Sequence, residues 1–383
     1  MAREGGIGLR AAAGGIGIGL AVGWNIASLG AIATRLSTAY GVGLATIGLF
    51  TTVQFVMHMV MQIPGGRAAD RWGARTSSLV GLGLIAVGNA VALAGPYPAL
   101  GFAGRAIVGL GTGFGFVGGS DYIRARGGSP LVQGLYGGSS ILSPGIALAV
   151  VPGLASWTGF RAPYLGALAV VGVCGALLVL APAAPRTVRH AGERLDFSFV
   201  RDRRLHRLAA IHSLSFGFSV IVGNWVVTLL EHHGQPKGAA AAAGSLTLLL
   251  GFFTRIAGGP LLRRHDAHRF VAASLVLGGV GCAVLALPVP LAVLVAAAGL
   301  VGLATGLPFA TVFVGSAVAR PDAPGAAIGF VNAFASLTIV VGTPLVGLTF
   351  SLPGDGRIGF VVLAALAALA AVVTPRTRDL APR

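Results

Sequence analysis

Twelve separate stretches of this sequence are apolar and long enough to cross a lipid bilayer. A transmembrane helix needs about 20 predominantly apolar residues, and the charged residues of this chain gather in short segments between such stretches. Charged residues make up 10% of the chain, whereas soluble domains contain about 25%. The mean hydropathy is +0.85. These properties exclude a single soluble core and predict an all-α membrane protein with 12 transmembrane helices.

The predicted spans form two sets of six on either side of a basic segment. They lie at residues 11–33, 44–64, 76–95, 98–122, 132–153, 162–182, 207–230, 239–262, 270–288, 290–318, 325–351 and 357–375. We therefore expect an N-terminal six-helix bundle at residues 1–184, a cytoplasmic central loop at 185–206 and a C-terminal six-helix bundle at 207–383. Arg3 and Arg10 precede the first span, which predicts an uncleaved signal anchor.

The basic residues are distributed unevenly over the loops. If the N-terminus is cytoplasmic, 21 of the 27 Lys and Arg residues lie on the cytoplasmic side. The outer loops contain four, which are Arg35, Arg161, Lys237 and Arg357. The remaining two, Arg105 and Arg255, lie within spans. The positive-inside rule then predicts a multi-pass protein of a bacterial inner (cytoplasmic) membrane with both termini in the cytoplasm. Because the basic residues occupy short loops, the net charge of +16 does not indicate nucleic-acid binding.

The two halves of the chain repeat one another. Gly109-Leu110-Gly111-Thr112-Gly113 returns as Gly302-Leu303-Ala304-Thr305-Gly306, which is 193 residues later (302 minus 109). Gly65-Gly66 returns at the same offset as Gly258-Gly259. The repeat predicts two pseudo-symmetric six-helix bundles, and duplicated transporters of this kind hold their substrate near the membrane midplane between the halves.

The loop between the second and third spans contains a recognisable motif. Gly66, Asp70, Arg71, Gly73 and Arg75 match the pattern G-x-L-a-D-r-x-G-r-k, apart from an Ala in place of the Leu. This loop resembles the signature of the major facilitator superfamily. The resemblance implies a monomeric secondary transporter that works by alternating access, with no catalytic residue and no cofactor.

The same resemblance implies a role for the charges of this loop. In the family, the motif's Asp and Arg, here Asp70 and Arg75, join an acidic residue of helix 4 in an ion-pair network that holds the cytoplasmic side closed. Asp121 is the matching residue. The alternative is that these charges only set the topology, because isolated surface ion pairs contribute less than about 1 kcal/mol. Arg263 stands where the second copy would repeat Asp70, so any such gate is asymmetric.

Two arginines fall inside predicted spans, where a charge costs at least about 2.5–3.5 kcal/mol. Arg105 resembles the helix 4 Arg of the superfamily, which is associated with coupling or substrate binding; alternatively it extends to the membrane surface. Arg255 can bind an anion through a forked pair of hydrogen bonds or contact lipid headgroups. The superfamily's nitrate/nitrite porters resemble this arrangement, with an Arg on helix 2 and another on helix 8. Gln62 occupies the helix 2 position here, which favours another small anion.

Polar side chains of several spans are candidates for lining a substrate cavity. They are Asn25, Gln54, His58, Arg105, Tyr136, Asn224, Arg255 and Asn332. His58 is also a candidate proton carrier. Three methionines surround His58, and thioethers with an imidazole can bind Cu(I). No Cys or second His accompanies them in the sequence, so we predict no metal site.

These features bear on three candidate functions. Arg255 and the lack of a mid-membrane Asp or Glu favour a secondary transporter of a small solute, possibly an anion, whose partners are that solute and the lipid bilayer. Proton-coupled efflux of amphiphilic organic compounds or drugs is the alternative, because many superfamily members are exporters. A polytopic membrane enzyme is disfavoured, because the sequence contains no H-E-x-x-H motif, no phosphate-binding G-x-x-x-x-G-K-[ST] loop and no paired intramembrane carboxylates.

Overall fold

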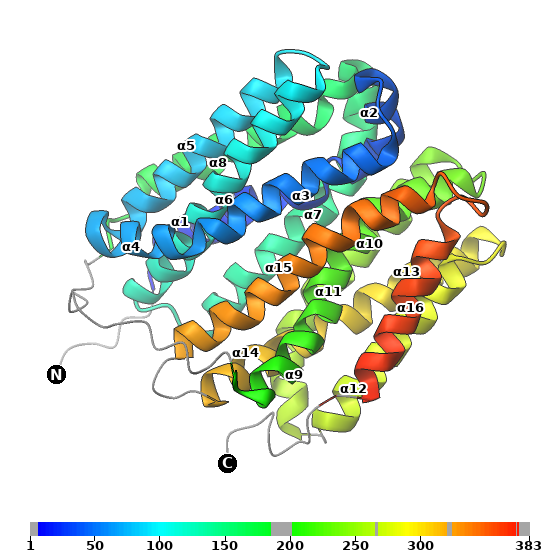
Figure 1. The fold of residues 1–383 in the computed structure, drawn as a ribbon. Helices are drawn as coiled ribbons and strands as arrows, with labels where there is room; N and C mark the ends of the chain where they lie inside the picture. Colours follow the sequence, from blue (N-terminus) through cyan, green and yellow to red (C-terminus); the bar gives the residue numbers. More distant parts are fainter. Residues whose placement is uncertain (1–6, 185–200, 265–266, 320–323, 373, 375–383) are drawn as a thin grey trace. The chain divides into compact units, whose positions relative to one another are not determined.

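A computed structural model of the chain describes residues 7–184, 201–264, 267–319, 324–372 and 374. Every regular element in these residues is helical, and none of them belongs to a strand (Figure 1). The chain divides into two compact units. The first comprises Met1–Val42 and Phe50–Gly192, and the second comprises Gly43–Leu49 and Glu193–Arg383. Most of the predicted central loop lies outside the described residues, so the predicted domain boundaries stay predictions.

The described helices follow the predicted spans closely. In the first half they are α1 (Leu9–Ala27), α2 (Ala33–Tyr40), α3 (Leu44–Val60), α4 (Gln62–Trp72), α5 (Ala74–Leu93), α6 (Pro98–Ala125), α7 (Pro130–Thr158) and α8 (Ala162–Leu180). In the second half they are α9 (Arg203–His212), α10 (Phe218–His232), α11 (Lys237–Arg264), α12 (Ala267–Leu285), α13 (Leu291–Gly306), α14 (Pro308–Ala319), α15 (Pro324–Thr349) and α16 (Arg357–Val372). Each of the twelve predicted spans overlaps one of these helices or a broken pair of them. Helix α2, however, lies almost entirely between the first two predicted spans, and most of α4 covers the segment predicted as the loop after the second span.

Helix length and hydropathy support membrane insertion. Among the described residues, 8 helical segments are long and apolar enough to span a bilayer, or 9 if Gly30–Tyr40 and Leu44–Val60, bent by 117°, form one span. Two further helices, α13 and α16, are apolar but shorter. One of the 8 segments, Leu131–Leu180, covers both α7 and α8. The all-α membrane fold predicted from the sequence is therefore confirmed.

The outer surface of the helices is apolar. On α16, Val361 and Leu369 are 53% and 65% exposed, and a soluble protein rarely exposes a continuous apolar surface of this kind. In a bilayer this surface contacts lipid chains. The helix can face lipid in this way because its backbone hydrogen bonds are satisfied within the segment.

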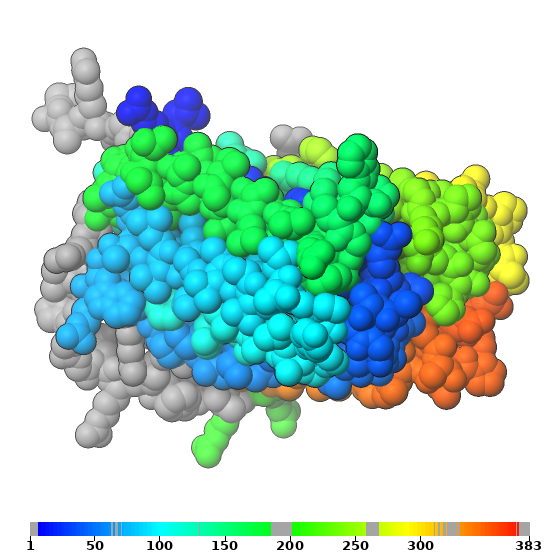
Figure 2. Space-filling view, turned by 90° about the horizontal axis from the view of Figure 1, so that it is seen from above, coloured from blue at the N-terminus to red at the C-terminus, as the bar shows by residue number. Residues whose placement is uncertain are grey.

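Small residues hold the helices of the first unit together. A Cβ atom added at Gly104 of α6 would lie 2.5 Å from the carbonyl oxygen of Gly88 on α5, and one added at Gly88 would lie 2.5 Å from that of Gly104. Such spacing allows the two backbones to touch, as is common between membrane helices. Figure 2 shows α5 and α8, which also pack against each other, on one face of this unit.

In the second unit, α13 packs against both α11 and α12, and α16 packs against α12. Helices α9 and α10 are joined by a π-helical turn at Ser213–Gly217. The bond pattern i→i+5 is rare and occurs mostly as single turns inside α-helices, frequently at functional sites. The segment Arg203–His232 is a continuous candidate span in which most residues are buried, so this turn lies inside a membrane helix.

Candidate functional site

The π-helical turn brings together two aromatic side chains and a histidine in the second unit. His212 is the last residue of α9, and its ring stacks on Phe216 of the turn at 5.7 Å between ring centroids, with 19° between the planes. Phe309, near the start of α14, contacts the His212 ring at 5.9 Å. The turn thus places the imidazole between rings from two elements.

Arg255 of α11 lies over the same two rings. Its guanidinium carbon is 4.3 Å from the centroid of Phe309 and 5.4 Å from that of Phe216. The side chain is 6% exposed, and its Nε is buried without a hydrogen-bond partner in the described structure. Aromatic faces attract a cation and replace part of its lost hydration, but they accept no directed hydrogen bond from the guanidinium edge.

Asn332 of α15 completes this group of side chains. Its Oδ1 lies 3.4 Å from Nε2 of His212, so the amide fixes the orientation of the imidazole. Helices α9, α11, α13, α14 and α15 contain no Asp or Glu. We call His212, Phe216, Arg255, Phe309 and Asn332 the arginine–histidine cluster. It supplies a buried positive charge and no negative one from these helices, which suits an anionic ligand.

Asn224 lies elsewhere in the second unit, on α10. Its Nδ2 donates to the carbonyl of Val220 on the same helix at 2.8 Å, and its side chain is 3% exposed. The side chain is therefore buried and bonded to its own helix. Its predicted role in the cavity stays a prediction.

In the first unit, His58 and Gln54 lie on one face of α3 against α6. Nδ1 of His58 is 3.1 Å from Oγ1 of Thr112, and the imidazole contacts the Phe55 and Phe116 rings at 5.9 Å each. Gln54 is 2% exposed, and its Oε1 is buried with no hydrogen-bond partner in the described structure. Among the described residues, no group of three or more His, Cys, Asp or Glu side chains could hold a metal ion.

Arg105 belongs to a second polar network of this unit. Its terminal nitrogen donates to the backbone carbonyl of Asn25 at 2.6 Å, and Asn89 donates from Nδ2 to the Asn25 side-chain oxygen at 3.0 Å. Arg105 is 1% exposed. It therefore points into the unit. The alternative interpretation of the sequence, in which Arg105 extends to the membrane surface, does not fit this burial.

Tyr136 of α7 is also buried, with its hydroxyl donating to the carbonyl of Phe116 at 2.5 Å. This bond ties α7 to α6. The predicted cavity residues of the first unit thus fall into two groups. One surrounds Asn25 and Arg105, and the other contains His58 and Tyr136, which both contact Phe116.

Of the charged residues in the loop motif, Arg75 has described hydrogen-bond partners. Gly73 has a φ of +88°, which favours glycine, and separates α4 from α5. Arg75 donates from Nε to the carbonyl of Leu178 at 3.1 Å and from Nη2 to that of Val179. Arg71 is exposed. The side chain of Asp70 and the surroundings of Gly66 lie outside what the structure describes.

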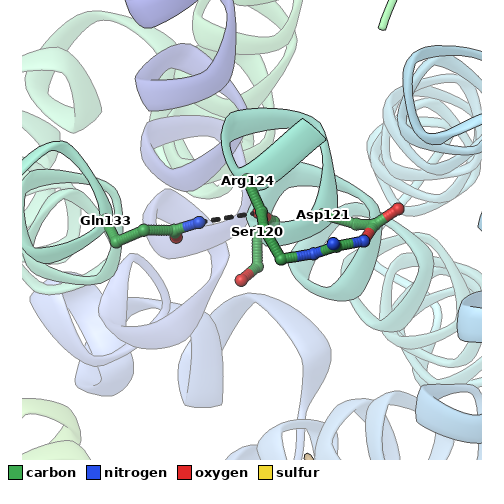
Figure 3. A network of polar contacts seen from close by, with 4 residues as sticks. All are labelled: Ser120, Asp121, Arg124 and Gln133. Carbon is green, nitrogen blue, oxygen red and sulfur yellow. Dashed lines mark hydrogen bonds and ion pairs between the residues drawn. The ribbon is translucent and has the colours of Figure 1, made fainter. Parts of the chain in front are cut away.

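Asp121 pairs with Arg124 on its own helix (Figure 3). The Arg124 Nε donates to the carboxylate at 3.1 Å, and Gln133 of α7 donates to the neighbouring Ser120 carbonyl at 3.0 Å. Asp121 and Arg75 are thus engaged separately in this structure. The predicted ion-pair network that joins them stays a prediction.

Sequence reasoning missed His212, Phe216 and Phe309. His212 follows the basic run of α9 and sits at the edge of a predicted span, where it has the pattern of an interfacial residue. Because it meets Asn332 across 120 positions of the chain, only the folded structure reveals the pairing. The sequence offered one signal for this site: His212 lies four residues before Phe216 in a predicted span that contains no acidic residue.

Three comparisons place this geometry among known proteins. A family model described as Major Facilitator Superfamily matches residues 14–314 and 207–382. The crystal structure of the nucleoside transporter NupG (D323A mutant) is similar, with 16% identity, a TM-score of 0.74 and coverage of 95% of this chain and 98% of that one. The crystal structure of a D-xylose–proton symporter has 15% identity, a TM-score of 0.74 and coverage of 96% and 98%. No curated protein matches in sequence.

Proposed function

Because this chain belongs to the major facilitator superfamily, we propose that it is a secondary transporter that moves a small anion across the cytoplasmic membrane by alternating access. The family and the transporter folds of its neighbours establish a multi-pass transporter rather than an enzyme. The anion and the mechanism are the parts proposed here.

The observation that carries the anion proposal is the environment of Arg255. Its charge is buried on two aromatic rings, its Nε has no hydrogen-bond partner among the described residues, and helices α9, α11, α13, α14 and α15 contain no carboxylate. A buried charge requires compensation. The planar guanidinium fork matches the oxygens of a carboxylate or another planar oxyanion, so an anionic substrate would supply both the charge and the hydrogen-bond acceptors.

A binding screen on the purified protein tests this proposal. Thermal unfolding is measured with nitrate, formate, benzoate and sulfate, with uncharged sugars and nucleosides, and with lipophilic cations. We expect at least one anion to stabilise the protein, and Arg255→Ala to abolish the shift. Arg203→Ala, which removes an exposed arginine of α9, is the matched control and should retain it. Stabilisation by lipophilic cations alone would favour drug efflux and overturn the anion proposal.

The loop motif supports a gate that alternates with the substrate site. We propose that Gly66, Asp70, Arg71, Gly73 and Arg75, together with Asp121, control closure on the cytoplasmic side. An Asp70→Asn variant should then populate the inward-open state. Labelling of single cysteines placed in the predicted cavity, with a reagent added from the cytoplasmic side, should increase. Equal labelling of the variant and its parent would contradict the gate.

The distribution of basic residues supports an inner-membrane protein with both termini in the cytoplasm. We also propose that it acts as a monomer. Fusion of a reporter that is active only in the cytoplasm to each predicted loop tests the orientation. The loops that contain Arg71 and Arg269 should report the cytoplasm, and those that contain Arg35 and Arg357 should not. Light scattering of the detergent-purified protein tests the monomer.

A further inference from the structure

His212 and Arg255 share the same two aromatic rings. The Phe216 ring stacks on the imidazole and also lies under the guanidinium, and Phe309 contacts both groups as well. A titratable group and a permanent cation therefore contact the same two rings. Like charges this close repel one another in a medium of low polarity, so the state of one group affects the other.

The elements packed against His212 offer few other charges. Helices α14 and α15 and the π-helical turn contain no titratable side chain, and Arg357 of α16 is bonded to His233. On α9 itself, Arg203, Arg204, His206 and Arg207 lie five or more positions earlier, with Asp202 at the helix start. In the described residues around the ring, Arg255 is thus the cation that faces His212.

We propose that the anion bound at Arg255 is a planar monocarboxylate taken up together with one proton, and that His212 holds this proton. This inference rests on the proposed anion transport. The carboxylate offsets the charge of Arg255 and thereby removes the repulsion that opposes a proton on His212. Binding of the anion and of the proton is then mutually favourable, and such coupling is reciprocal by thermodynamic necessity.

The coupling makes transport electrically neutral. The empty cluster carries one positive charge, on Arg255, and so does the cluster that holds a carboxylate and a protonated His212. No net charge then moves with the substrate. A membrane potential that is negative inside opposes the entry of an anion alone, but it does not oppose the entry of an anion with a proton.

The two aromatic rings favour a planar anion. The guanidinium carbon of Arg255 lies over both rings, so an aromatic carboxylate can pack its ring against the edges of Phe216 and Phe309 while its oxygens bind Arg255. Asn332 holds the imidazole at 3.4 Å and so positions His212 without carrying a proton itself.

Calorimetry of benzoate binding to the purified protein tests the inference. Binding is measured near pH 6.5, close to the ordinary histidine pKa of about 6.5, in two amine buffers with different ionisation enthalpies. The difference in heat gives the number of protons taken up. We expect up to about one proton per benzoate in the parent protein, and close to none in His212→Gln with benzoate still bound. His206→Gln, on the same helix, is the matched control and should retain the uptake.

The outcomes separate the two proposals. If no anion binds, the proposed function fails. If nitrate or another inorganic anion binds but benzoate does not, the monocarboxylate is wrong and anion transport stands. If benzoate binds the parent protein without proton uptake, or if the uptake survives in His212→Gln, the role of His212 is wrong. His212→Asn, which keeps an amide for Asn332, replaces the Gln variant if the latter does not fold. If benzoate binds the parent protein and the measured proton uptake is zero, this result alone contradicts the role of His212.

Discussion

A Cβ atom added to Gly302 would lie 2.3 Å from the carbonyl oxygen of Thr247. The first half of the chain contains the same relationship, because a Cβ atom on Gly109 would lie 2.3 Å from the carbonyl oxygen of Gln54. The two residues of each pair are 55 positions apart (302 minus 247, and 109 minus 54). The internal repeat read from the sequence therefore extends to the contacts between helices.

We predict that Gly302→Ala destabilises the protein by about 1–3 kcal/mol, which is typical of overpacking at a close contact. The backbone of α11 cannot yield as a flexible side chain would. Gly299→Ala is the control, because Gly299 lies on α13 like Gly302. Its Cβ would meet side-chain carbons of Leu250 and Leu246 at 3.4 and 3.5 Å, which are ordinary contact distances. Unfolding by dodecyl sulfate in mixed micelles, followed by circular dichroism, measures the difference. Equal midpoints for the two variants would contradict the prediction.

The sequence predicted the features that depend on local pattern. Apolar length located the helices, and glycine spacing revealed the repeat. The cost of an intramembrane charge identified Arg105 and Arg255, both of which are buried. These inferences succeeded because hydropathy and helix packing are properties of continuous segments, and each segment contains its own signal.

The contacts that define the site depend on distant segments and were not predictable. Arg75 binds carbonyls that lie 103 and 104 positions later in the chain, and His212 meets Asn332 from another helix. The π-helical turn at Ser213–Gly217 follows no sequence pattern that distinguishes it from an ordinary helix. The helical face of a side chain can be read from spacing, but its partner depends on how whole helices pack.

The stacking of Arg255 on Phe309 should be measurable as a coupling energy. We predict that Phe309→Leu and Arg255→Met, made singly and together, show about 0.5–2 kcal/mol of coupling in their unfolding free energies, as expected for a buried cation–π contact. The control is Phe253→Leu, an exposed ring two positions before Arg255. Its effect should add to that of Arg255→Met without coupling. A Phe309 cycle with no coupling would show that the guanidinium is stabilised by other groups.

His233 directly follows α10, and its protonation opposes folding. Arg357 donates from Nε to Nε2 of His233 at 3.2 Å, which requires an unprotonated acceptor nitrogen. Burial lowers the pKa of His233 below its ordinary 6.5, and the charges of Arg357 and His232 lower this pKa further, while Asp355 acts in the opposite direction. In the unfolded chain the imidazole regains its ordinary pKa.

We therefore predict that stability decreases as the pH falls below about 6.5, because the unfolded state then binds a proton that the folded state does not. Above this pH both states are neutral at His233, and the contribution is constant. Unfolding midpoints measured between about pH 7.5 and 5 should fall less in His233→Gln than in the parent. Arg357→Gln should also reduce the slope, because the neighbouring charge is removed. The same slope in all three proteins would exclude His233 as the titrating group.

Arg75 interacts with the C-terminal end of α8. The carbonyls of Leu178 and Val179 belong to the final turn of α8, where carbonyl groups lack partners within the helix and a cation is favourable. Arg75→Gln should therefore lower the unfolding free energy by about 1.5–3 kcal/mol, the usual range for hydrogen bonds to a charged group. Arg75→Lys should have an intermediate effect, because an ammonium group lacks the planar fork that reaches both carbonyls.

Among the described residues, Asp121 pairs with the exposed side chain of Arg124, so Asp121→Asn should cost less than about 1 kcal/mol. In the conformation described here, the effects of Arg75→Gln and Asp121→Asn should add, because each residue binds a different partner and shares none. The same mixed-micelle titration tests the double variant. A clear departure from additivity would mean that Arg75 and Asp121 interact in the resting protein. The proposed network would then be formed there, rather than only in the state that is closed to the cytoplasm.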